Sequence, residues 1–123
     1  ILQKNFTRET IMICKITTHV LDLVQGTPAN NIPTILEKLV DSNLWETIGS
    51  GTTNEDGRID NLSEDNNSII SGTYRLTFDV SSYYETDSFY SSIPIIFNIT
   101  NTNRHYHVPL LLSRFGYSTY RGS

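Results

Sequence analysis

The sequence of 123 residues contains a single cysteine, Cys14, and no cluster of basic residues. One cysteine excludes an internal disulfide and a zinc-thiolate cluster. Nine lysines and arginines stand against 13 acidic residues, for a net charge of −4. This balance argues against binding to nucleic acid or to an anionic membrane surface. The apolar runs are also far shorter than the ~20 residues that a membrane-spanning helix needs. What is left is the composition of an ordinary globular domain, 37% hydrophobic and 18% charged.

Targeting signals are scarce as well. The N-terminal region lacks the uninterrupted apolar segment of a secretory signal, and the chain ends in Arg-Gly-Ser, not in the Ser-Lys-Leu type of peroxisomal signal. With only one cysteine, we expect a cytoplasmic protein, with the peroxisome as the alternative. Residues 1–11 show no strand or helix pattern. We expect them to be a disordered or non-native extension of one domain over residues 12–123.

What the sequence does contain is a series of short β-rich runs separated by Gly, Asn, Asp and Pro. The segment "NEDGR" at 54–58 includes Asp-Gly, a strong turn signal because glycine tolerates positive φ. Seven or eight short strands at a spacing of about 8–12 residues predict an all-β sandwich. A short helix is expected only within 83–91, where the helix propensity is weak. The predicted strands cover residues 13–24, 32–40, 44–53, 69–84, 93–100, 105–113 and 116–123.

Strand alternation predicts that several polar side chains share one side of the sandwich. If residues 104–112 form a strand, His105 and His107 lie on one face, and the other face is largely apolar and belongs to the core. In the tail, Ser118 and Tyr120 share a face by the same count. We therefore expect an outward sheet face that carries His, Ser and Tyr with few charges, which suits a partner surface or a shared cleft.

The residues alone leave three roles open for the histidines. In the first, they are partly exposed strand residues without a function. In the second, His105 and His107 bind a metal, because His-x-His directs two imidazoles to one side of a strand, and His19 is the third ligand. No suitable Asp or Glu stands beside the pair. In the third, they perform acid–base chemistry, because imidazole titrates near neutral pH.

Three segments resemble, in order, the signature blocks of the 5-hydroxyisourate hydrolases, which are also called transthyretin-related proteins. They are "ITTHVLDLVQGTPANNIP", "TNEDGRIDNL" and "YHVPLLLSRFGYSTYRGS". The resemblance extends over roughly residues 12 to 123, and the terminal "YRGS" is highly specific. It implies a transthyretin-like sandwich of two four-stranded antiparallel sheets with one short helix. It also implies a homotetramer, a dimer of dimers whose sheet faces line a channel that holds the active sites.

The resemblance further implies an activity. This is the hydrolysis of 5-hydroxyisourate to 2-oxo-4-hydroxy-4-carboxy-5-ureidoimidazoline in urate degradation, with no cofactor and no metal. The family's catalytic residues correspond to His19, Arg58, His107 and Ser123, and its substrate-binding residues to His19, Arg58 and Tyr120. The carrier transthyretin has the same fold but replaces the two histidines, the arginine and the tyrosine. The rival function is therefore a non-catalytic carrier of an aromatic small molecule.

A division of labour follows as a hypothesis. His19 and His107 activate water and relay its proton to the leaving nitrogen, and which of them is the base stays open. Arg58 orients the oxygen-rich substrate and stabilises the negative charge that develops on it. Tyr120 contacts the ligand, and Ser123 brings a hydroxyl and the terminal carboxylate to the site.

One residue departs from the family pattern. Arg114 stands in "SRFGYST", where the family usually has proline. Proline fixes φ and would stiffen the turn before the last strand. We expect arginine to cost some rigidity at this turn and to affect stability more than activity.

Overall fold

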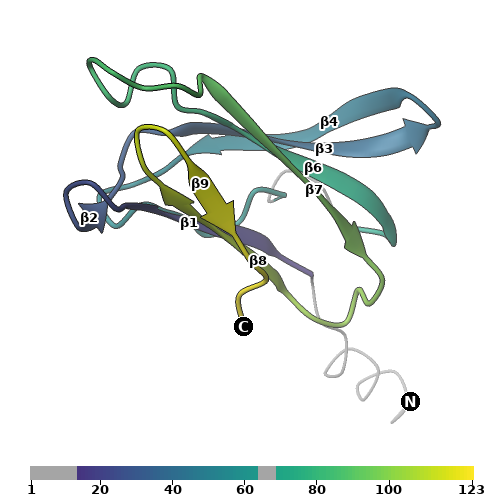
Figure 1. Cartoon of the computed structure of the whole chain (residues 1–123). Coiled ribbons are helices and arrows are strands. Elements are labelled where there is room, and N and C mark those ends of the chain that lie inside the picture. The colour runs from purple at the N-terminus through teal and green to yellow at the C-terminus, as the bar shows by residue number, and fades with distance from the viewer. Residues whose placement is uncertain (1–13, 64–68) are drawn as a thin grey trace, which may run out of the picture.

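The computed structural model describes residues 14–63 and 69–123, so the predicted extension at 1–11 lies outside the described residues. Within these two ranges the chain forms nine β-strands and no helix, and hence no helix that could cross a membrane. The strands stack as two sheets (Figure 1). One sheet has the order β4-β3-β6-β7, formed by Leu44–Thr52, Pro33–Asp41, Gly72–Asp79 and Ser92–Ile99.

The second sheet holds the residues of functional interest. Its order is β2-β1-β8-β9, formed by Thr27–Pro28, Ile16–Asp22, Tyr106–Leu112 and Tyr117–Thr119, and the short strand β5 (Arg58–Ile59) also pairs with β1. The all-β sandwich is thereby confirmed. Strand β2 lies within a predicted turn at 25–31, and β5 begins at the last residue of the predicted turn at 54–58. The pair β1 and β8 runs parallel, whereas the expected sheet was antiparallel throughout.

The prediction of a short helix within 83–91 was wrong. Residues 81–90 form turns and bends instead. The hydroxyls of Tyr83 and Tyr84 both donate to the carboxylate of Asp22, at 2.7 and 2.8 Å. These tethers pull two consecutive side chains to one buried acceptor. Consecutive residues on a helix point about 100° apart, so this arrangement competes with the weak helix propensity of the segment.

Arg114, expected to cost rigidity at its turn, makes contacts that the sequence did not predict. Its Nη1 donates to the carbonyl of Thr86 at 2.6 Å, and its guanidinium lies 4.9 Å from the ring centroid of Tyr84. Its own carbonyl accepts from the Phe89 backbone at 2.8 Å. The arginine therefore ties the turn before β9 to the 81–90 segment, and a proline could make only the backbone contact and neither of the two guanidinium contacts.

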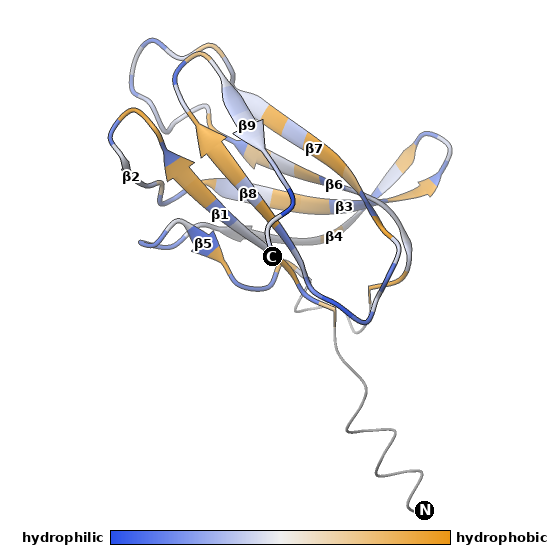
Figure 2. Cartoon of the chain, turned by 60° about the horizontal axis from the view of Figure 1, so that its bottom comes forward, coloured by the Kyte–Doolittle hydropathy of each residue, from blue (hydrophilic) through white to orange (hydrophobic). Residues whose placement is uncertain are grey.

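The core lies between the two sheets, and strand alternation decides which residues enter it. In β8, Tyr106, Val108, Leu110 and Leu112 are buried, as the alternation predicts, and the strand is hydrophobic along most of its length (Figure 2). Burying each large aliphatic side chain contributes about 1.5–3 kcal/mol. This core fixes which side of the β1–β8 sheet faces outward, and that outward side carries His19 and His107.

Candidate active site on the outer sheet face

The turn before β5 sets the position of Arg58. The Oδ1 of Asn54 accepts hydrogen bonds from the backbone of Asp56 and Arg58, at 2.9 and 3.0 Å. Gly57 has a φ of 73° and its carbonyl accepts from the Val20 backbone at 2.7 Å. A Cβ at this glycine would overlap the Val20 carbonyl oxygen. The "NEDGR" turn therefore needs glycine twice, for its φ and for its close approach to β1.

Strand register then brings the predicted residues together. In the antiparallel pair β1–β5, His19 lies directly opposite Arg58. In the parallel pair β1–β8, Thr17 lies opposite His107. Opposed residues project from the same face of a sheet. The residues at 17, 19, 58 and 107 therefore all share the outward face.

His107 has a local hydrogen-bond partner and a close backbone neighbour. Its Nδ1 lies 2.7 Å from the Oγ1 of Thr17. In the tail after β9, Gly122 forms an isolated bridge with His107 and donates its backbone N–H to the His107 carbonyl at 2.8 Å. A Cβ at position 122 would overlap the Cδ2 of the imidazole. The glycine of "YRGS" thus lets the tail lie directly against the ring.

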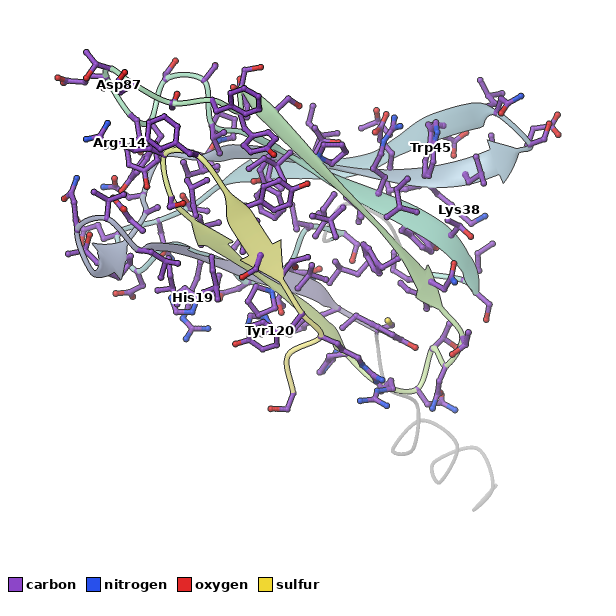
Figure 3. All side chains as sticks on the ribbon, viewed as in Figure 1. His19, Lys38, Trp45, Asp87, Arg114 and Tyr120 are labelled. Carbon is purple, nitrogen blue, oxygen red and sulfur yellow. The ribbon has the colours of Figure 1, made fainter. Side chains whose placement is uncertain are left out.

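The tail itself is anchored beside the site. The guanidinium of Arg121 lies 5.4 Å from the ring centroid of Tyr106, whose hydroxyl accepts from the backbone of Thr100 and Asn101 at 3.2 and 3.0 Å. Tyr120 is 57% exposed. Figure 3 shows its ring projecting from the same side of the sheet as His19. Ser123 is exposed and follows directly on the bridge between β8 and the tail.

The two imidazoles share one electrostatic environment. Burial lowers the pKa of His107, and the positive charges of Arg58 and His19 lower it further. Burial also lowers the pKa of His19, again with the Arg58 cation adding to the effect, while a backbone hydrogen bond and the charge of Asp56 act in the opposite direction. Both histidines are therefore largely neutral at pH 7, and a neutral imidazole can accept a proton.

His105 takes part in a different contact. Its Nδ1 accepts the backbone N–H of Lys15 at 3.0 Å, so it ties β8 to the start of β1. Among residues 14–63 and 69–123, no three His, Cys, Asp or Glu side chains come together as a potential set of metal ligands.

Sequence reasoning missed the two residues that touch the His107 ring. Thr17 stands in "TTHV" two positions from His19, and Gly122 in "YRGS" next to Ser123. Neither residue carries a chemical signal of its own. Their contacts depend on the β1–β8 register and on the tail bridge, and strand periodicity within one segment reveals neither.

Fold and geometry together give a two-sheet β-sandwich protein in which one outward sheet face groups two neutral imidazoles and a guanidinium. Residues 16–122 match the model of the HIUase/Transthyretin family. The chain is 48% identical to a probable 5-hydroxyisourate hydrolase of Caenorhabditis elegans, over 88% of this chain and 80% of that protein. It is 44% identical to the 5-hydroxyisourate hydrolase of Salmonella dublin, with the same coverage of both chains. The chain belongs to the HIUase/Transthyretin family.

Solved structures of a 5-hydroxyisourate hydrolase and of a transthyretin both share the fold of this chain. The 5-hydroxyisourate hydrolase of Klebsiella pneumoniae matches with a TM-score of 0.78 and 32% identity, over 90% of this chain and all of that one. Transthyretin from Sparus aurata matches with a TM-score of 0.80 and 30% identity, over 89% of this chain and 97% of that one. The fold therefore does not separate an enzyme from a carrier, and the site has to decide.

Proposed function

We propose that this protein is a 5-hydroxyisourate hydrolase. The observation that carries the proposal is the grouping of His19, Arg58 and His107 on one sheet face, where the Arg58 cation and burial keep both imidazoles neutral. A carrier of an aromatic ligand has no need for two proton-transfer groups beside a fixed cation. The hydrolases named above are relatives over most of the chain, which supports the same assignment.

The proposed reaction needs what these side chains offer. Water attacks a carbonyl of the fused ring, one histidine takes the water proton as the new C–O bond forms, and the acyl C–N bond then breaks. The leaving nitrogen receives that proton from the imidazolium, so both histidines end neutral. The other proton of the water stays on the new carboxyl group, which loses it to solvent and leaves as a carboxylate. Arg58 presents a planar set of donors to the oxygen atoms on which negative charge develops.

Tyr120 and Ser123 complete the proposed site. Tyr120 projects on the same side as His19 and can stack on or donate to a bound ring (Figure 3). Ser123 adds a hydroxyl, which can hold a histidine or the attacking water. No cofactor is needed, because each step moves only a proton or an acyl carbon.

The assembly we propose is a homotetramer, a dimer of dimers. A groove of about 330 Å³ beside the site is lined by His107, Tyr120 and Arg121 together with residues of β7, but it does not include His19 or Arg58. The single chain thus leaves the site open on one side. Strand β7 is the edge strand of its sheet. It carries Ile96, which is 61% exposed, and Phe89 just before it is 73% exposed. Exposed apolar side chains at a sheet edge favour pairing with another copy.

A cytoplasmic location is also proposed, because the one cysteine is free.

The test is substrate consumption. 5-Hydroxyisourate is generated in situ with urate oxidase, and its ultraviolet absorbance is followed with and without the protein. We expect decay well above the spontaneous rate. A folded tetramer that binds the compound and leaves its spontaneous decay unchanged would instead support the carrier function.

A further inference from the structure

The imidazole of His107 is held along two of its edges. On one edge, Nδ1 lies 2.7 Å from the hydroxyl oxygen of Thr17. On the other edge, the backbone of Gly122 lies against Cδ2, with no space for a Cβ. Neither contact involves Cε1 or Nε2, and His107 lines an open groove. Of these two, only Nε2 can exchange a proton with a substrate.

The chemistry of the partner on Nδ1 matters for what Nε2 can do. A carboxylate accepts hydrogen bonds only, so it would keep the proton on Nδ1 and favour the imidazolium. A hydroxyl can donate to a bare Nδ1 when Nε2 carries the proton, and it can accept from Nδ1–H when Nε2 is bare or the ring is charged. Thr17 therefore remains hydrogen-bonded to the ring in each protonation state that a proton relay passes through.

We propose that Thr17 is a positioning residue that holds the His107 ring through Nδ1, so that Nε2 is the nitrogen that transfers protons in the reaction. The inference rests on the proposed hydrolase function. It adds a residue outside the predicted site set and names the working nitrogen of His107.

The neighbouring threonine shows what a purely structural hydroxyl looks like here. The Oγ1 of Thr18 is buried and donates to the Val108 carbonyl at 2.6 Å. This contact joins β1 to β8 on the core side and does not touch an imidazole. Thr18 is thus a matched control one residue away on the same strand.

The experiment compares Thr17→Val, Thr17→Ser and Thr18→Val in the assembled protein. Valine keeps the branched shape that suits a strand and removes the hydroxyl, while serine retains it. We expect Thr17→Val to lower kcat by roughly 3- to 10-fold, the usual worth of one hydrogen bond, with a smaller change in KM. Thr17→Ser is expected to restore most of the rate. Thr18→Val is expected to lower the melting temperature while kcat stays near the wild-type value.

A second readout does not depend on activity. The ¹⁵N chemical shifts of the His107 ring report which nitrogen is hydrogen-bonded and which carries the proton. We expect the Nδ1 signal to move in Thr17→Val and to stay close to the wild-type position in Thr17→Ser and Thr18→Val. An unchanged Nδ1 signal in Thr17→Val would overturn the inference, and so would equal kcat losses in the valine and serine variants. If the wild-type protein does not hydrolyse the substrate, the proposed function fails, and the shifts still decide whether Thr17 holds the ring.

Discussion

His19 and Arg58 lie directly opposite each other on two antiparallel strands, β1 and β5. The chain passes through β2, β3 and β4 between them, and the two-residue strand β5 then brings them into register. Burial is the largest cause of the lowered His19 pKa, and the adjacent guanidinium adds to it. The same cation acts on His107. Arg58 thus helps to keep two proton acceptors uncharged, in addition to the substrate contact that we propose for it.

Replacing His107 with asparagine tests its role in proton transfer. Asparagine retains a polar side chain of similar size but cannot take or give a proton near neutral pH. We expect kcat to fall by about 10²–10⁴-fold, the usual loss for one acid–base group. Circular dichroism and gel filtration should show an unchanged fold and assembly.

His105→Asn is the matched control for this substitution. His105 contacts the Lys15 backbone, and it is not among the groups that shift the pKa of His19 or His107. We expect its turnover to stay within about twofold of the wild-type value, as for a substitution outside the site. If both variants lost activity to the same degree, the assignment of His107 would be wrong.

The pH dependence of activity tests the electrostatic role of Arg58. A histidine acting as base works only when neutral, so kcat/KM falls as the pH drops through its pKa, which lies below 6.5 in this site. Arg58→Gln removes the cation and raises the pKa of both imidazoles, so the acid limb moves to higher pH. Burial persists, so the shift is only partial.

Arg58→Lys separates charge from geometry. Lysine keeps the positive charge but not the planar set of donors. We expect the acid limb of kcat/KM to stay near its wild-type position while the rate falls on the order of 10²-fold through poorer charge stabilisation. The measurement is kcat/KM from pH 5 to 8 for both variants. Identical acid limbs in the glutamine and lysine variants would contradict the electrostatic role.

The long strands were predictable because their apolar residues alternate. In β8, a period of two residues predicts the burial of Tyr106, Val108, Leu110 and Leu112, although Pro109 between them is buried as well. The conformation of the segment at 83–91 was not predictable, because it depends on hydrogen bonds to Asp22, far away in the sequence. Tertiary contacts of this kind override weak local propensity.

In the site, too, some residues could be predicted from the sequence and others could not. Motif resemblance named His19, Arg58 and His107, and the β1–β5 and β1–β8 registers place them on one face. Thr17 and Gly122 were missed, because each acquires its role from one neighbour on another strand. Register between distant strands is set by the assembled sheet, which local periodicity does not encode.

Gly122→Ala tests whether the close approach of the tail matters for catalysis. The added methyl would overlap the Cδ2 of His107, so either the ring or the tail must move. Displacement of about 1 Å can cost on the order of 10²-fold in rate. We expect kcat to fall by 10-fold or more, measured by the decay of 5-hydroxyisourate, with a small change in melting temperature.

Gly116→Ala is the control for a glycine in the same tail. A Cβ at position 116 would meet only the Ser113 hydroxyl, at 3.8 Å, which is ordinary contact. We expect its kcat to equal that of the wild-type protein. Equal rates in both glycine variants would mean that the tail does not position the ring.

Asp22 forms the densest polar network that the structure describes away from the site. Its carboxylate is 1% exposed and accepts four hydrogen bonds, from the hydroxyls of Tyr83 and Tyr84 and from the backbone of Val24 and Gln25. Burial alone would raise its pKa, but the four donors together outweigh burial and lower it. The ionised carboxylate therefore stabilises the fold that holds the 81–90 segment on β1.

Asp22→Asn should reduce the free energy of unfolding by roughly 2–3 kcal/mol at pH 7, because an amide has one acceptor oxygen and two donors where the network requires acceptors only. The control Asp79→Asn alters an exposed carboxylate bonded to Ser81 and should cost less than about 1 kcal/mol. The measurement is chemical denaturation at one protein concentration, since association would otherwise shift the midpoint.

The pH dependence of the stability lost in Asp22→Asn gives the sharper test. The folded pKa of Asp22 is lower than the unfolded value of about 3.9, so its stabilising contribution is complete above that value and is lost as the pH falls through the folded pKa. The gap in unfolding free energy between the wild-type protein and Asp22→Asn should therefore be widest from pH 5 to 7 and narrow below pH 4. A gap of constant size down to pH 2 would mean that the aspartate acts through its shape and not through its charge.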